Sequence, residues 1–156
     1  MGNEFAQTTE WNYKSELSWD LLQFDSHKKM QACVKSLNHL YSAQPALHEL
    51  QFKTEGFEWI DLNNRQEGII VFKRKGKNKN EDVLVILNMT PVVRRDWKIK
   101  VAGKQEWKEI FNSDQLAYWG TGDVYNSDVK VKMVDKDKDL YEINIHLPAL
   151  AGLVFR

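Results

Sequence analysis

Carboxylates are the side chains of this sequence that offer the widest choice of chemistry. Asp and Glu together number 22. Cleavage of a glycosidic bond needs two of them, an acid and a base or nucleophile, roughly 5–9.5 Å apart. Glu4 and Glu10 share one stretch near the start of the chain, but nothing in their spacing requires them to meet. Because so many carboxylates make an accidental pair common, we expect no catalysis by this chain alone.

Other reactive groups are also missing from the sequence pattern. There is no Gly-x-Ser-x-Gly motif for a nucleophilic serine, and the 8 glycines form no phosphate-binding loop. The single cysteine, Cys33, excludes an intrachain disulfide and a cysteine-rich metal site. The histidines lack the spacing of metal ligands; they are His27, His39, His48 and His146. The sequence therefore predicts neither a metal nor a cofactor.

Aromatic residues make up 12% of the chain. Such side chains fill β-rich cores or bind flat apolar faces such as those of sugar rings. One group, Trp11, Tyr13 and Trp19, lies near the start, and Tyr118 and Trp119 precede a Gly-containing stretch. Both groups are candidate carbohydrate platforms, and packing between elements is the alternative that we favour.

A helix is predicted from Asp25 to Gln44. Asp25 or Ser26 can cap its start, and Pro45 disfavours its continuation. Its apolar residues recur at helical spacing; they are Met30, Cys33, Val34, Leu37, Leu40 and Tyr41. Residues 1–24 are too apolar for a free linker and too irregular for a regular element, so we expect a loop that packs against another part of the protein.

After Pro45 the hydrophobic period changes to two, which predicts β-strands. The candidate strands are 57–61, 68–74, 83–87, 97–101, 107–111, 129–133, 141–147 and 153–155. The continuous apolar run 83–87 is expected in the centre of a sheet, and Trp107, Glu109 and Phe111 are expected on one face. Short strands joined by polar turns favour an antiparallel β-sandwich, and the absence of intervening helices argues against a parallel α/β sheet.

Charge and hydropathy exclude several partners. Lys plus Arg number 22, equal to Asp plus Glu, so the formal net charge is zero. A nucleic-acid binder should carry a basic excess, and a membrane-surface protein a basic patch. No apolar run reaches the ~18 residues of a membrane span, and the polar residues 1–10 do not resemble a signal peptide. Together with a lone cysteine, these features predict a cytoplasmic protein with no nucleic-acid or membrane partner.

Several short segments, in a fixed order, match one enzyme family over essentially the whole chain. The matching segments are 1–7, 10–12, 17–22, 37–41, 44–49, 55–61, 87–91, 111–114 and 147–154. Together they resemble the C-terminal portion of 1,4-α-glucan branching enzymes of glycoside hydrolase family 13, and the string Phe57-Glu58-Trp59-Ile60-Asp61 is the most specific of them. The family has Gly where this chain has Ala6, a difference that matters only if the backbone φ there is positive.

The resemblance implies a fold and an activity for the parent enzyme. Such enzymes cut an α-1,4-glucan and reattach the piece through an α-1,6 bond, using carboxylates on strands of a (β/α)8 barrel that precede the segment matched here. Residues 1–44 would be the end of that barrel (eighth-strand exit, loop and last helix), and residues 45–156 the C-terminal β-sandwich. This chain alone would be inactive and would support the barrel.

The resemblance also suggests where substrate would lie. Loops that follow barrel strands form the active-site face, so Glu4, Gln7, Glu10 and Trp11 are candidates to contact an α-glucan or organise the rim. Trp119 is a candidate contact on the sandwich.

Three alternatives to this picture stay open. Residues 1–24 can serve barrel packing alone, the chain can be a stand-alone carbohydrate-binding module, and it can be a structural domain without a ligand. The expected partners are an α-glucan and the barrel of the same protein. A second copy is a further expected partner, because the helix would keep an apolar stripe uncovered.

Overall fold

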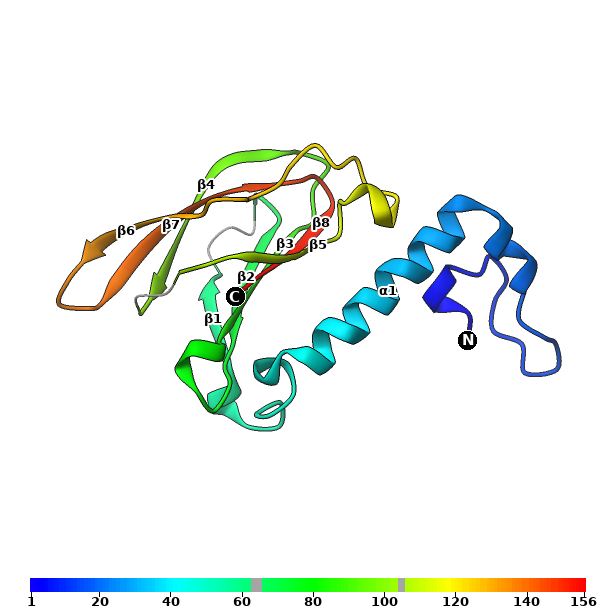
Figure 1. Cartoon of the computed structure of the whole chain (residues 1–156), viewed down its shortest axis with the longest axis horizontal. Coiled ribbons are helices and arrows are strands. Elements are labelled where there is room, and N and C mark those ends of the chain that lie inside the picture. Colours follow the sequence, from blue (N-terminus) through cyan, green and yellow to red (C-terminus); the bar gives the residue numbers. More distant parts are fainter. Residues whose placement is uncertain (63–65, 104–105) are drawn as a thin grey trace.

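The computed structural model describes residues 1–62, 66–103 and 106–156. One helix precedes two antiparallel sheets, one of five strands in the order β1-β2-β3-β8-β5 and one of three strands in the order β4-β7-β6 (Figure 1). The elements are α1 (Asp25–Ala43), β1 (Phe57–Asp61), β2 (Ile69–Arg74), β3 (Val83–Asn88), β4 (Arg94–Ala102), β5 (Glu109–Asn112), β6 (Lys130–Asp135), β7 (Leu140–Leu147) and β8 (Ala151–Phe155).

This architecture confirms the predicted fold class, a mainly β antiparallel sandwich preceded by a loop and one helix. Each predicted strand overlaps an observed one, and the apolar run of β3 lies in the sheet interior, between β2 and β8. The helix ends at Ala43, one residue before the predicted end. The predicted capping is wrong, because Phe24 is the N-cap residue and no side chain caps the helix. Asp25 instead lies in the first turn, where its negative charge interacts favourably with the positive end of the helix dipole.

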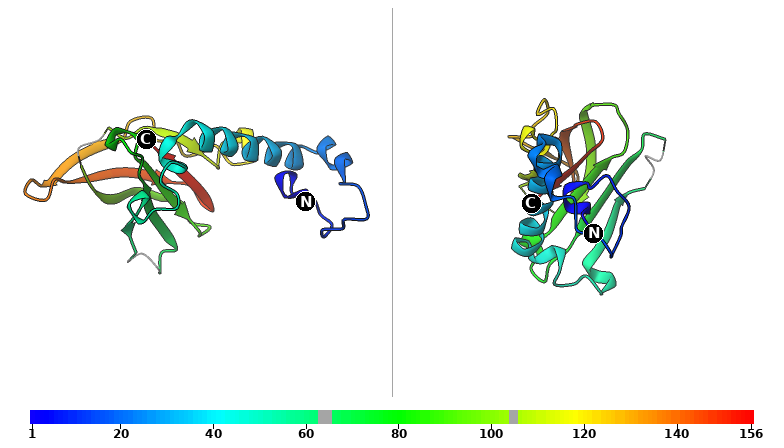
Figure 2. Two further views of the ribbon diagram at one scale, coloured as in Figure 1. Left: turned by 90° about the horizontal axis from the view of Figure 1, so that it is seen from below. Right: turned by 90° about the vertical axis from the view of Figure 1, so that its right-hand side faces the viewer.

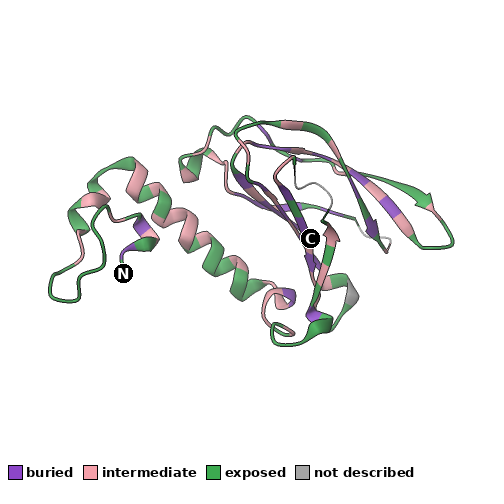
Figure 3. Ribbon diagram, turned by 180° about the vertical axis from the view of Figure 1, so that it is seen from behind, coloured by how far each residue is buried: buried purple, intermediate pink, exposed green. Residues whose placement is uncertain are grey.

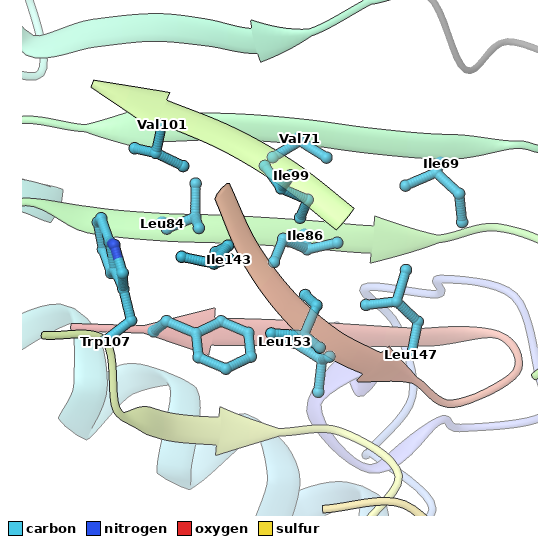
Figure 4. Packing of buried hydrophobic residues seen from close by; sticks show 12 residues of the cluster. Ile69, Val71, Leu84, Ile86, Ile99, Val101, Trp107, Ile143, Leu147 and Leu153 are labelled. Carbon is cyan, nitrogen blue, oxygen red and sulfur yellow. The ribbon is translucent and has the colours of Figure 1, made fainter. Parts of the chain in front are cut away.

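The main core lies between the two sheets (Figure 4). Strands of the five-stranded sheet contribute Ile69, Val71, Leu84, Ile86, Leu153 and Phe155, and the other sheet contributes Ile99, Val101, Ile143, Ile145 and Leu147. Alternate residues of β7 are buried, as a strand with one face on a core requires. Each fully buried Leu or Ile side chain contributes about 1.5–3 kcal/mol relative to an exposed one.

The expectation that Trp107, Glu109 and Phe111 share one face is wrong. Trp107 joins the core between the sheets, whereas Phe111 joins a second cluster on the outer side of the five-stranded sheet. The pairing of β5 with β8 shifts register between Glu109 and Phe111. An irregularity of this kind reverses the side-chain alternation on which the prediction depended.

Helix α1 covers part of the outer face of the five-stranded sheet, so the molecule has three layers at that point. Cys33 and Leu40 of α1 pack against the second cluster, which is formed by Ala46, Val83, Phe111 and Val154. This contact confirms Cys33 as a packing residue, and burial raises the pKa of its thiol. The N-terminal half of α1 and the segment before it extend beyond the sheets (Figure 2).

The aromatic residues after Pro45 divide between core and surface, and Trp97 and Tyr118 are partly buried against the two clusters. Trp107, Phe111, Tyr141 and Phe155 are buried, but Phe52, Phe57, Trp59, Trp119 and Tyr125 are exposed. Hydrophobic periodicity identifies a strand, but it does not show which of its two faces is covered.

Candidate functional site

Residues 1–24, called the N-terminal arm below, fold back onto the start of α1. Phe5 is fully buried, and its ring centroid lies 5.2 Å from that of Trp19. The Nδ1 atom of His27 on α1 lies 2.8 Å from the carbonyl oxygen of Phe5. The arm therefore packs on the helix, as predicted for this irregular apolar segment, while much of its surface stays exposed.

Gln7 organises the backbone of the arm. Its Oε1 accepts a hydrogen bond of 2.9 Å from the backbone N–H of Ser18, and its own N–H donates to the Gly2 carbonyl at 3.0 Å. Gly2 and Ala6 both have positive φ, 79° and 54°. Ala6, where the resemblance leads us to expect Gly, is thus left-handed, a conformation that strains a residue with a Cβ atom.

The other predicted rim residues lie in different surroundings. Glu4 lines a surface depression of about 240 Å³ together with residues of α1, whereas Glu10 is exposed. Trp11 is 66% exposed, its indole N–H donates to the sulfur of Met1, and its ring lies 6.2 Å from that of Tyr13. In the part of the chain that the structure describes, no hydrogen bond joins Glu4 to Glu10.

One side of α1 is only partly covered, although the Tyr41 ring lies 5.5 Å from that of His48 and its hydroxyl donates to Gln51. Met30, Leu37 and Tyr41 are 38%, 41% and 44% exposed. At about 100° per residue these three lie on one stripe of the helix, and the packed residues Cys33 and Leu40 flank it. We call Met30, Leu37 and Tyr41 the uncovered stripe. No residue of α1 is fully buried, although the helix has 19 residues (Figure 3).

The loop between β5 and β6 presents Trp119. The side chain of Asp114 accepts hydrogen bonds from the backbone N–H and the hydroxyl of Thr121, at 2.9 and 2.6 Å. At Gly120 a Cβ atom would lie 2.1 Å from the Asp114 backbone, so only Gly fits there. Trp119 has a φ of 71°, and its ring is 59% exposed, as the prediction of a surface platform requires.

A buried polar cluster holds the base of the same loop, and sequence reasoning missed it. Glu109 accepts hydrogen bonds from both the backbone and the side-chain N–H of Asn126, at 3.2 and 2.7 Å, and from the side chain of Asn112 at 3.3 Å. Burial raises the pKa of Glu109, and these hydrogen bonds lower it by less. The only feature of the sequence that pointed to this cluster was Glu109 itself, a carboxylate at an inward-facing position of a predicted strand.

A second polar cluster lies around Lys73 on β2, which is 7% exposed. Its ammonium group lies 3.4 Å from Glu58 and 3.6 Å from Asp82. Burial raises the pKa of Glu58, but the neighbouring Lys75 and Lys73 lower it further, so that the pKa lies below its usual value. These pairs offset the cost of burying a charge at this place in the sheet.

The described residues contain no group of three His, Cys, Asp or Glu side chains arranged to hold a metal ion. Among the same residues, no helix is long and apolar enough to cross a membrane.

Comparison with known proteins gives a consistent family. Residues 59–156 match the α-amylase C-terminal all-beta domain. The chain is 38% identical over 151 residues to a 1,4-alpha-glucan branching enzyme GlgB of Pseudoalteromonas atlantica, covering 97% of this chain and 21% of that protein. It is 40% identical over 158 residues to the enzyme of the same name from Clostridium perfringens, covering 100% of this chain and 24% of that protein.

A solved structure shares the fold. A debranching enzyme from Nostoc punctiforme aligns with a TM-score of 0.53 at 11% sequence identity, over 92% of this chain and 24% of that one. The chain thus spans about a quarter or less of the length of the relatives it matches. It belongs to the family of α-amylase C-terminal all-beta domains and is homologous to the C-terminal region of 1,4-alpha-glucan branching enzymes.

Proposed function

We propose that this chain is the C-terminal part of a glucan branching enzyme and that it supports the catalytic barrel. In this proposal residues 1–44 form the end of the barrel and residues 45–156 form the C-terminal sandwich. The carboxylates that carry out branching lie in the remainder of the protein, so this chain alone has no branching activity.

The uncovered stripe of α1 is the observation that carries the proposal. One flank of the helix packs on the sandwich through Cys33 and Leu40, while Met30, Leu37 and Tyr41 stay 38–44% exposed. Tyr41 contacts only the polar side chains of His48 and Gln51 in the segment after the helix. A helix at the surface of a finished domain normally buries its apolar stripe, and a contiguous exposed apolar patch marks an interaction surface. We propose that the strands of the barrel, which the resemblance implies, cover this stripe.

The N-terminal arm fits the rim of that barrel. Gln7 fixes the backbone of the arm through Ser18, which makes it a positioning residue. Glu10 and Trp11 are exposed beyond it, and Glu4 lies against α1. Since the loops after barrel strands form the active-site face, we propose that Trp11 and Glu10 contact the α-glucan and that Gln7 and Glu4 hold the arm in place.

Two further properties belong to the same proposal. Without the barrel, the uncovered stripe is expected to drive self-association of the chain, because it is apolar and accessible. Cys33 is a free thiol, which suits the reducing cytoplasm, where we expect the protein to act.

The docking role is tested with a charge placed on the uncovered stripe. The partner is the Clostridium perfringens relative truncated to lack the segment that matches this chain. We expect the two polypeptides to cosediment, and Leu37→Asp to abolish the complex because it buries an unpaired carboxylate. Lys35→Asp, an exposed position on another side of α1, is the matched control and should still bind. Equal binding by both variants would contradict the proposal.

A further inference from the structure

Two features mark Trp119, which ends the short helical turn Leu116–Tyr118 at a place where Gly is usual. Its backbone is left-handed, with a φ of 71°, and its ring is 59% exposed. The left-handed region is strained for most residues other than Gly, Asn and Asp, and a bulky residue there is an outlier. Burial of the ring does not offset this strain, because more than half of the side chain faces solvent. Strained residues that packing does not explain gather at ligand sites.

The surrounding contacts fix the backbone of the loop on both sides of Trp119. Before it in the sequence, Tyr118 stacks on Phe111 with ring centroids 5.6 Å apart, which attaches the loop to the second cluster. Beyond it, the Asp114 carbonyl accepts from the Gly122 N–H at 2.8 Å, and the Asp114 side chain accepts from Thr121. A ring fixed before binding loses little conformational entropy when a ligand stacks on it.

Lys29 of α1 adds a cation to this surface. Its Nζ lies 5.6 Å from the centroid of the Trp119 ring, over one face, within the range of a cation–π contact. Lys29 lies about 100° round the helix from Met30, so it is on a different side from the uncovered stripe. In Figure 1, the loop that carries Trp119 and the short turn of residues 3–5 lie on opposite sides of α1. Trp119 therefore meets α1 on a side other than the uncovered stripe.

We propose that Trp119 is a binding platform for an α-1,4-glucan chain, separate from the N-terminal arm. The exposed part of the indole stacks on the apolar face of a glucose ring, and Lys29 fixes the orientation of the indole from its own side. An aromatic ring offers a large apolar area at little conformational cost, which suits a ligand with apolar ring faces and a polar periphery. The choice of glucan as the ligand rests on the proposed function.

The test is isothermal titration of the chain with maltoheptaose. We expect saturable binding with a dissociation constant in the millimolar range or below. Trp119→Asn should weaken it about tenfold or more, because Asn tolerates the left-handed backbone and the variant removes only the ring. Trp119→Phe should recover part of the affinity. Leu116→Ala is the matched control, since Leu116 lies in the same loop and is 66% exposed but carries no ring. Unchanged NMR spectra of the other residues will show that the variants are folded.

Absence of saturable binding by the unmodified chain, or equal affinity of Trp119→Asn and Leu116→Ala, would overturn the proposal. The experiment also separates this site from the docking role. Leu37→Asp should bind maltoheptaose with unchanged affinity while failing to dock on the barrel. A chain that docks but does not bind the sugar would refute the platform alone, and a chain that binds through Trp119 but does not dock would refute the proposed role alone.

Discussion

The side chain of Asn126 donates a hydrogen bond of 2.7 Å to the carboxylate of Glu109, and both residues are buried. The same Asn126 amide accepts from the His146 N–H at 2.7 Å and donates to the His146 carbonyl at 3.0 Å. One side chain thus joins the edge strand β5 of one sheet to β7 of the other, across the loop that carries Trp119. This link gives the loop a fixed base.

Removing that link should cost stability. We expect Asn126→Ala to lower the free energy of unfolding by about 1–3 kcal/mol, because it leaves the buried Glu109 carboxylate and the half-buried backbone of His146 without their hydrogen bonds. Asn78→Ala is the control, since the Asn78 side chain bonds Glu81 at an exposed site, and it should change stability by less than about 0.5 kcal/mol. Urea unfolding gives both values. Similar values for the two variants would show that the cluster contributes nothing beyond a surface contact.

The carboxylate of Glu109 should make stability depend on pH. Burial raises its pKa in the folded chain above the ordinary value of 4.5, so the folded state binds the proton more tightly than the unfolded state does. The stability linked to this proton is fully present below the unfolded pKa and is lost as pH rises through the folded pKa. In Glu109→Gln this dependence is absent. The free energy of unfolding of the unmodified chain minus that of the variant should therefore increase as the pH falls from 7 to about 4.5.

Glu58 supplies the control of opposite sign. Because its pKa lies below the ordinary value in the folded chain, its contribution is present above the unfolded pKa and is lost as pH falls through the folded one. The stability difference for Glu58→Gln should therefore shrink on acidification. If the stability difference for Glu109→Gln does not change with pH, or decreases as the pH falls, the carboxylate of Glu109 is not desolvated in the folded chain.

The turn between β7 and β8 contains a strained leucine. Leu150 has a φ of 48°, is 69% exposed and donates its N–H to the Thr90 carbonyl at 2.8 Å. Short hairpin loops usually place Gly at such a left-handed position. We expect Leu150→Gly to raise the free energy of unfolding by roughly 0.5–1 kcal/mol, since relief of strain exceeds the added entropy of the unfolded chain. Leu150→Ala keeps the strain and should show no gain, so thermal unfolding in which the two variants coincide would contradict this reading of the turn.

The helix and strands could be predicted from the sequence, but the order of the strands in the sheets and their register could not. Period-two alternation, as in 141–147, and the helical spacing from Met30 to Tyr41 depend on local geometry, so they identify β7 and α1 directly. The order of strands in two sheets, with β8 between β3 and β5, depends on contacts between distant segments. A register shift such as that between Glu109 and Phe111 leaves no local signal, which is why the side-chain alternation was predicted wrongly there.

The candidate site shows the same division. Trp119 was singled out from its residue type and the neighbouring glycines; it is exposed, in contrast to the packing between elements that we favoured, and its binding of a sugar stays a prediction. Gln7 was singled out by resemblance, but its bond to Ser18 spans 11 residues and could not be read from the pattern. The Glu109–Asn126 contact spans 17 residues, and a buried polar pair of this kind has no periodic signature. Its members are visible only once the fold brings β5 beside the loop.

Branching activity in a reconstituted pair tests whether this chain completes the catalytic barrel of a branching enzyme. The truncated Clostridium perfringens relative, this chain, and a mixture of the two are each incubated with amylose, and new α-1,6 linkages are measured by proton NMR. We expect no activity for this chain, little for the truncated barrel, and activity in the mixture that Leu37→Asp abolishes and Lys35→Asp retains. Formation of α-1,6 linkages by this chain alone, or a mixture no more active than the truncated barrel, would contradict this expectation.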